Sequence, residues 1–95
     1  MSNSSVSFLL QFEQQYSVLT ADITSKLCRL NSVTCADRRE TCSQLESQLE
    51  EVDELLDQME LAIRDIPQGH ADRAKYDNRL RSYRVDAGQL KTEYV

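Results

Sequence analysis

Residues 45–66 of the chain read LESQLEEVDELLDQMELAIRDI. Apolar side chains recur in this stretch at alternating intervals of four and three residues, which is typical of a narrow apolar seam along one long helix. The seam residues are Leu45, Leu49, Val52, Leu56, Met59, Ile63 and Ile66. The same spacing extends backwards through Cys42, Arg38 and Cys35, so we expect a helix of about eight turns. Such a helix cannot bury its seam alone, and it requires partners.

Two other segments have the same periodicity. In the first, the apolar residues on one helical face are Leu9, Phe12, Tyr16, Leu19, Ile23, Leu27 and Leu30. Possible N-caps lie among residues 2–5, and Asn31 is a plausible stop because Asn tolerates the left-handed conformation. In the last segment the apolar face comprises Tyr76, Leu80, Tyr83, Ala87, Leu90 and Tyr94. Gly88 falls within this helix, off the seam, where it should cost about 1 kcal/mol relative to Ala.

Two short turns separate these segments. Residues 34–37 (TCAD) resemble a capping box, which would start the second helix, and Pro67 with Gly69 predicts the second turn. We therefore expect helices at about 5–30, 35–65 and 71–94, in one domain spanning residues 1–95. Short turns make successive helices antiparallel, so the predicted fold is all-α, an up-down-up three-helix bundle. The seam is still running at Tyr94, and we expect the chain to be a piece of a longer protein.

Charge and hydropathy narrow the function classes. The chain carries 16 acidic and 11 basic side chains, a net charge of −5, which disfavours general binding of nucleic acids or anionic lipids. No basic residue precedes Lys26, and the longest early apolar run is residues 8–10, so neither a secretory signal nor a membrane span is predicted. Residues 37–65 are strongly acidic, whereas basic residues are in excess over 71–94, which favours packing of these two segments against each other.

The residue types that carry chemistry are sparse. Cys28, Cys35 and Cys42 form no Cys-x-x-Cys pair, and we interpret them as reduced, small apolar fillers at or beside the seam. His70, beside Gly69, is expected to be a solvated turn residue. No ligand set for a metal, no cofactor motif and no catalytic arrangement is recognised, so we do not expect an enzyme.

Two features leave alternatives open. Leu61 lies off the seam and is expected to be exposed, either as an isolated surface leucine or as a contact for a partner. Arg79, Arg81 and Arg84 fan around the third helix. Ion pairing with the second helix would explain these arginines, and so would an interface with another protein.

Three stretches together resemble one family. They are residues 12–16 (FEQQY) with 19–26 (LTADITSK), residues 49–61 (LEEVDELLDQMEL) with 64–67 (RDIP), and Tyr76 with residues 78–83 (NRLRSY). In order and spacing the chain is similar to the N-terminal domain of the Vti proteins, Qb-SNAREs of vesicle transport, and most similar to their a-type branch. The match covers most of residues 12–94, and residues 31–44 depart from it.

The resemblance implies a trafficking role. Members of the family have an antiparallel three-helix N-terminal domain, then a SNARE motif and a membrane anchor, neither of which this chain contains. They act on the cytosolic face of Golgi, trans-Golgi network and endosomal membranes, and their N-terminal domain is bound as cargo by the ENTH domain of epsin-related clathrin adaptors. Other SNAREs would bind through the C-terminal part. As partner contacts we predict a group around one end of the second and third helices: Leu61, Ile66, Pro67, His70, Tyr76, Arg79 and Arg84.

The alternative is a purely structural module, either a spectrin-like three-helix repeat or a self-associating coiled coil. The sequence weighs against the repeat because no segment recurs. Arg38 on the extended seam also disfavours a long parallel coiled coil. We therefore expect a monomer.

Overall fold

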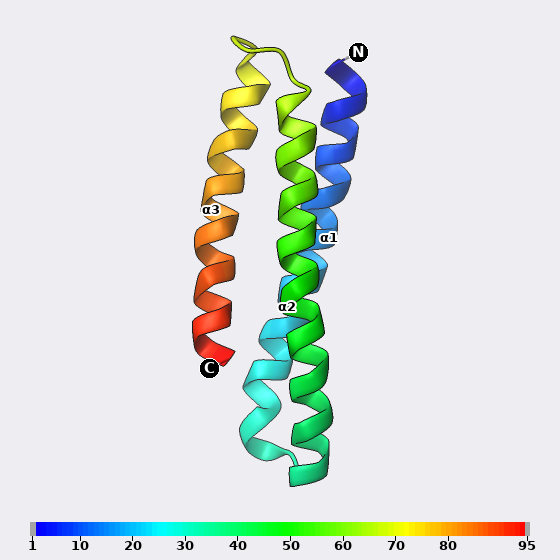
Figure 1. Ribbon diagram of the computed structural model, residues 1–95, viewed down its shortest axis with the longest axis vertical. Coiled ribbons are helices and arrows are strands. Elements are labelled where there is room, and N and C mark those ends of the chain that lie inside the picture. Colours follow the sequence, from blue (N-terminus) through cyan, green and yellow to red (C-terminus); the bar gives the residue numbers. More distant parts are fainter. Residues whose placement is uncertain (1, 95) are drawn as a thin grey trace.

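The computed structural model describes the backbone of residues 2–94 and the side chains of residues 6–30 and 32–94. Its elements are α1 (Ser2–Arg29), the short 3-10 helix η1 (Leu30–Ser32), α2 (Cys35–Arg64) and α3 (Ala71–Tyr94). They form an antiparallel up-down-up rod of 52 × 20 × 15 Å with α2 between its two neighbours (Figure 1). The predicted all-α three-helix fold is confirmed. Within the described chain, no helix is both long and apolar enough to cross a bilayer.

The core is formed by the predicted seams. The six seam residues within α2 are buried, and so is Ile66 just after it; from α1 and α3 the buried side chains are Leu9, Tyr16, Leu19, Ile23, Tyr76, Leu80 and Ala87. Leu55, which lies beside the α2 seam, is also buried. A central helix must cover neighbours on two sides, so its apolar face is wider than a two-helix seam requires. Leu55 adds that width.

The turn between α1 and α2 differs from the prediction. Asn31 does not end α1 through a left-handed conformation, because no described residue other than glycine has a positive φ. Instead the chain tightens into η1, and polar side chains satisfy the last carbonyls. The Arg38 guanidinium donates to the Leu30 carbonyl through Nε (3.0 Å) and Nη2 (2.8 Å), and the Ser32 hydroxyl donates to the Arg29 carbonyl (3.0 Å). Arg38 thus closes the turn and is not part of a helix seam.

The start of α2 agrees with the prediction in part, and the start of α1 differs from it. Thr34 caps α2, its hydroxyl accepting the Asp37 backbone N–H at 3.3 Å, which is one half of the predicted capping box. The box is half formed among the hydrogen bonds of the described residues, because the Thr34 backbone N–H donates no bond to the Asp37 carboxylate. α1 begins at Ser2 and not near residue 5, and the caps predicted among residues 2–5 lie outside the described side chains.

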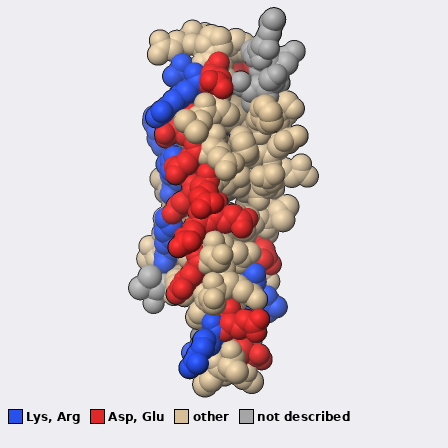
Figure 2. All heavy atoms as spheres, turned by 45° about the vertical axis from the view of Figure 1, so that its right-hand side comes forward, with Lys and Arg blue, Asp and Glu red and all other residues tan. Residues whose placement is uncertain are grey.

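Ion pairs join α2 to α3, as the charge distribution predicted. Arg84 Nη2 lies 3.2 Å from Asp57 Oδ1 and 3.3 Å from Glu60 Oε1, and Lys91 Nζ lies 2.6 Å from Asp53 Oδ2. In Figure 2 a stripe of acidic side chains runs beside a band of basic ones, while much of the upper right of the view carries no charge. Each exposed pair contributes about 0–1 kcal/mol. The pairs therefore add little to the stability of the bundle, and their main effect is on which helices pack side by side.

The rod is not covered equally along its length. α3 ends before it reaches the α1–α2 turn, so the last turns of α1 and the first turns of α2 pack mainly on each other (Figure 1). No described side chain between residues 24 and 44 is buried, although Leu27 and Leu30 pack against the core. The compact core lies in the other half, beside the α2–α3 turn.

Candidate partner-binding surfaces

The α2–α3 turn is held by a short set of hydrogen bonds. Gly69 has φ +88°, a left-handed conformation that suits glycine. The Arg73 guanidinium donates to the Ile66 carbonyl at 3.2 Å, and the His70 Nδ1 accepts the Asp72 backbone N–H at 3.1 Å. His70 is exposed, as predicted. Its bond with the Asp72 backbone N–H also caps the start of α3. The turn is a defined structure with an exposed outer side.

The structure divides the seven predicted contact residues. Leu61 is 61% exposed, and four others are also exposed: Pro67, His70, Arg79 and Arg84. Ile66 and Tyr76 are 0% and 2% exposed, so a docking protein cannot touch their side chains in this fold. Their apolar character serves the core, where each closes the end of the bundle nearest the turn. The contact set is corrected accordingly to five residues.

The two arginines of the set point to different neighbours. Arg84 pairs with Asp57 and Glu60 of α2, whereas Arg79 Nη1 lies 3.0 Å from Glu13 Oε1 of α1. The Arg79 guanidinium also lies over the Tyr76 ring, 5.3 Å from its centroid. Internal pairing therefore accounts for both side chains, and Arg79 pairs with the first helix where the second was expected. His70 has a role in the turn through its bond with Asp72, which leaves Leu61 and Pro67 as the part of the set without an intramolecular explanation.

A polar cluster links α1 to α3 near the middle of the rod. The Tyr83 hydroxyl donates to Glu13 Oε2 at 2.6 Å, and the Tyr16 hydroxyl donates to the Tyr83 carbonyl at 3.2 Å. The two tyrosine rings lie 4.4 Å apart between centroids. Burial, together with the hydrogen bond to the Glu13 carboxylate, raises the pKa of Tyr83 to about 12. This cluster holds the helices together and is not arranged as a reaction centre.

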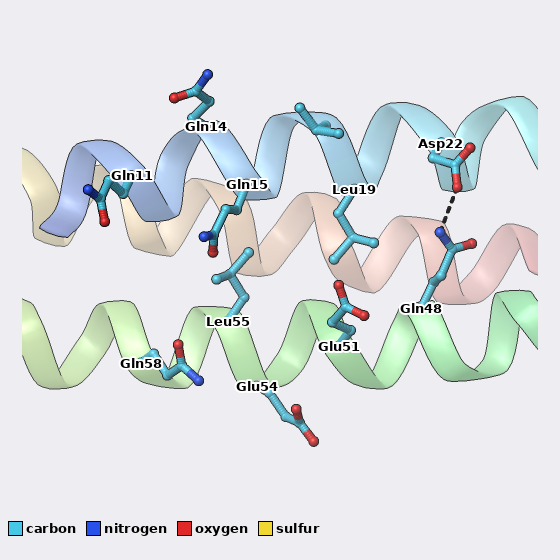
Figure 3. A pocket seen from close by; sticks show the side chains of 11 residues that line it. Gln11, Gln14, Gln15, Leu19, Asp22, Gln48, Glu51, Glu54, Leu55 and Gln58 are labelled. Carbon is cyan, nitrogen blue, oxygen red and sulfur yellow. Dashed lines mark hydrogen bonds between the residues drawn. The ribbon is translucent and has the colours of Figure 1, made fainter.

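A groove between α1 and α2 was not predicted from the sequence. It lies on the face away from α3 and has a volume of about 760 Å³ (Figure 3). From α1 it is lined by Gln11, Gln14, Gln15, Val18, Leu19 and Asp22, and from α2 by Gln48, Glu51, Glu54, Leu55 and Gln58. Glu13 is the only charged residue before Asp22, and it faces α3. That long uncharged stretch was the signal in the sequence that could have indicated a surface here.

One end of the groove is closed by polar contacts. Gln48 Nε2 donates to Asp22 Oδ2 at 2.7 Å, as Figure 3 shows, and Lys26 Nζ lies 2.9 Å from the same oxygen. The bond from the Lys26 ammonium, and then that from the Gln48 amide, lower the pKa of Asp22. Lys26 also donates to Gln48 Oε1 at 2.8 Å. The three side chains tie α1 to α2 and mark where the groove stops.

The cysteines do not act as core fillers, in contrast to our expectation. Cys28 and Cys35 are exposed, and Cys42 is partly buried. The sequence interpretation assumed that the seam continued to residue 35, but α3 does not reach that part of α2 (Figure 1). Within the part of the chain that the structure describes, no three His, Cys, Asp or Glu side chains are grouped to hold a metal ion.

Known proteins resemble this chain in sequence and in fold. The family model for the vesicle transport v-SNARE protein N-terminus matches residues 4–95. "Vesicle transport through interaction with t-SNAREs homolog 1A" of human and of mouse are each 42% identical over 83 residues, 87% of this chain and 37% of theirs. The fission yeast v-SNARE protein vti1 is 38% identical over 73 residues, 77% of this chain and 32% of its own. The chain thus spans about a third of the length of these curated relatives.

A solved structure agrees with the sequence comparison. The solution structure of the N-terminal domain of mouse Vti1a matches with a TM-score of 0.77 at 42% identity, covering 87% of this chain and 79% of that one. The resemblance stated from the sequence, including the a-type branch, is confirmed by these matches. The family is one of vesicle-transport proteins and not of enzymes. This chain belongs to the family of vesicle transport v-SNARE N-terminal domains.

Proposed function

We propose that this chain is the regulatory, adaptor-binding domain of a Qb-SNARE that works between the Golgi, the trans-Golgi network and endosomes. In this role the domain is exposed on the cytosolic face of those membranes, where the ENTH domain of an epsin-related clathrin adaptor binds it and selects the SNARE as cargo. Other SNAREs would engage a SNARE motif elsewhere in the full-length protein. This domain would then supply recognition, and the SNARE motif would supply fusion.

One observation carries the adaptor proposal: Leu61 is 61% exposed and lies near the α2–α3 turn, which also exposes Pro67 and His70. A leucine surrounded by the charged outer face of α2 has no role in the core. An apolar anchor with a polar surround is the usual centre of a small protein interface. The helices behind it are packed, so a partner would meet a surface that is already formed.

The test is a titration of this domain with an isolated ENTH domain of the epsin-related type, followed by calorimetry and two-dimensional NMR. We expect saturable heat and chemical-shift changes concentrated at residues 58–72. Leu61→Ser should weaken binding by about tenfold, since a central apolar anchor contributes more than 1 kcal/mol. Because the side chain is exposed, the variant should keep the fold.

Val85→Ser is the matched control. Val85 is 59% exposed, as an apolar residue on the outer side of α3, and its loss should leave the affinity unchanged. Equal weakening by both variants would mean that the contact is not centred on Leu61. Absence of heat and of shifts at high concentration would refute adaptor binding by this domain.

A further inference from the structure

We propose that the α1–α2 groove binds an amphipathic helix of a partner protein, one with an apolar stripe and Lys or Arg side chains along one edge. The groove runs from Gln11 to Asp22 on the face away from α3, apart from the α2–α3 turn. The lining of the groove shares no residue with the predicted adaptor contacts. It adds a second interaction surface to the domain.

The shape of the groove fits a helix. It follows α1 for the twelve residues from Gln11 to Asp22, which at 1.5 Å per residue is about 17 Å, or three helical turns. The two helices that form it are antiparallel neighbours, and α3 occupies the opposite face (Figure 3). A rod laid into this groove would complete a four-helix arrangement, which is a common way to cover such a face.

Apolar side chains are available along the groove. Leu19 and Leu55 lie in it, each less than a tenth exposed, and Val18 beside them is 67% exposed. Phe8 is 56% exposed. It lies on the same side of α1, because Gln11 and Gln15 follow it by three and seven residues, and residues at these spacings share a helix face. These residues give an apolar stripe on an incoming helix something to contact.

Charge decides which helix fits. Three acidic residues of α2 that face α3 form ion pairs: Asp53 with Lys91, and Asp57 and Glu60 with Arg84. Glu51 and Glu54 on the groove side have no ion pair among the described residues. No basic residue of α1 precedes Lys26, which already binds Asp22. Lys or Arg side chains of a docked helix would meet two glutamates that no described basic residue pairs with.

The opposite wall restricts the partner further. Gln11, Gln14 and Gln15 of α1 are neutral and can donate or accept hydrogen bonds, so basic residues are called for only along the edge that faces α2. A second copy of this chain is a poor occupant because each copy carries a net charge of −5. An anionic membrane surface is disfavoured for the same reason.

The test uses a labelled helical peptide of about 18 residues, long enough to exceed the groove. It has a leucine stripe with Lys on one edge and Gln on the other, and a second peptide carries Glu in place of Lys. We expect fluorescence anisotropy to show binding of the Lys peptide, weakened as salt rises, and about tenfold weaker binding of the Glu peptide. Amide shifts should map to residues 8–22 and 48–58.

Charge reversal supplies the decisive comparison. Glu51→Lys with Glu54→Lys should weaken the Lys peptide about tenfold and strengthen the Glu peptide. Glu40→Lys with Asp77→Lys alters the net charge equally outside the groove and should leave both affinities nearly unchanged. Equal loss with both pairs would reduce the effect to general attraction and overturn the proposal.

Two further outcomes are informative. Val18→Ser should weaken the Lys peptide several-fold, while Val85→Ser, on the outer side of α3, leaves its affinity unchanged. Sedimentation of the domain alone should give a monomer. Concentration-dependent dimers abolished by the Glu51→Lys, Glu54→Lys pair would place a second copy in the groove and contradict the proposed occupant.

Discussion

Tyr83 shows what a single side chain contributes to this bundle. Its ring packs on Tyr16, and its hydroxyl donates to the Glu13 carboxylate, which also binds Arg79. The side chain therefore joins α3 to α1 through one apolar contact and one hydrogen bond to a charged acceptor. The neutral hydroxyl is required for that bond, because a tyrosinate has no proton to donate and would face the carboxylate as a like charge.

The pH dependence of stability should reflect this contact. Since folding raises the pKa of Tyr83 from 10 to about 12, its contribution is complete below about pH 10 and is lost as the pH rises toward 12. In urea unfolding, Tyr83→Phe should lower the free energy of unfolding by about 1.5 kcal/mol at pH 8. The gap between the variant and the parent should narrow from pH 10 to 12. A gap that stays constant would show that the hydroxyl does not titrate in this range.

Replacing either glycine by alanine should change the free energy of unfolding, in opposite directions at the two positions. Gly88 lies within α3, and a Cβ added there would meet nothing within 4 Å, so Gly88→Ala should raise the free energy of unfolding by about 1 kcal/mol. Gly69 has φ +88°, and Gly69→Ala should lower it by about 1 kcal/mol. Thermal denaturation of the two variants beside the parent tests both. Destabilisation by Gly88→Ala would mean that α3 needs flexibility at that point.

At the scale of the helix, the apolar seam matters more than the charges beside it. α2 and α3 meet through buried residues such as Leu80, and ion pairs flank that contact. The sequence placed the limits of α2 and α3 to within a residue. Periodicity identified the helices, and local signals, namely the Thr34 cap and the Pro67–Gly69 turn, marked where they begin and end. The end of α1 was also placed to within a residue, but the predicted stop, a left-handed Asn31, was wrong. A side chain eight residues further on, Arg38, determines how that turn closes.

Substitutions on α3 can compare seam and charge directly. Leu80→Ala should lower the free energy of unfolding by about 2–5 kcal/mol, because it removes buried apolar volume. Arg84→Gln should lower it by less than about 1 kcal/mol, since its partners Asp57 and Glu60 are accessible to water. Chemical denaturation at low and high salt measures both. A larger effect from Arg84 would show that the ion pairs dominate the α2–α3 contact.

For the whole molecule, the sequence predicted which residues are buried better than it predicted the surface. Seam residues are recognised by period, but whether two helices leave a groove depends on which face the third one covers. That choice follows from the relative placement of α1, α2 and α3, and no segment encodes it alone. Ile66 and Tyr76 were predicted as partner contacts because they lie near the turn, whereas packing turns both inward. Gln11 and Val18 carry no motif, and only the folded bundle brings them into one groove with Glu51 and Glu54.

The uneven reach of α3 has a practical consequence for studying these surfaces. Cys35 is exposed at the start of α2, at the opposite end of a 52 Å rod from the α2–α3 turn and outside the lining of the groove. With Cys28 and Cys42 replaced by serine, its thiol offers one attachment point for a dye or spin label. Such a probe would report tumbling or distance when a ligand arrives at either surface, without itself occupying the place where that ligand sits.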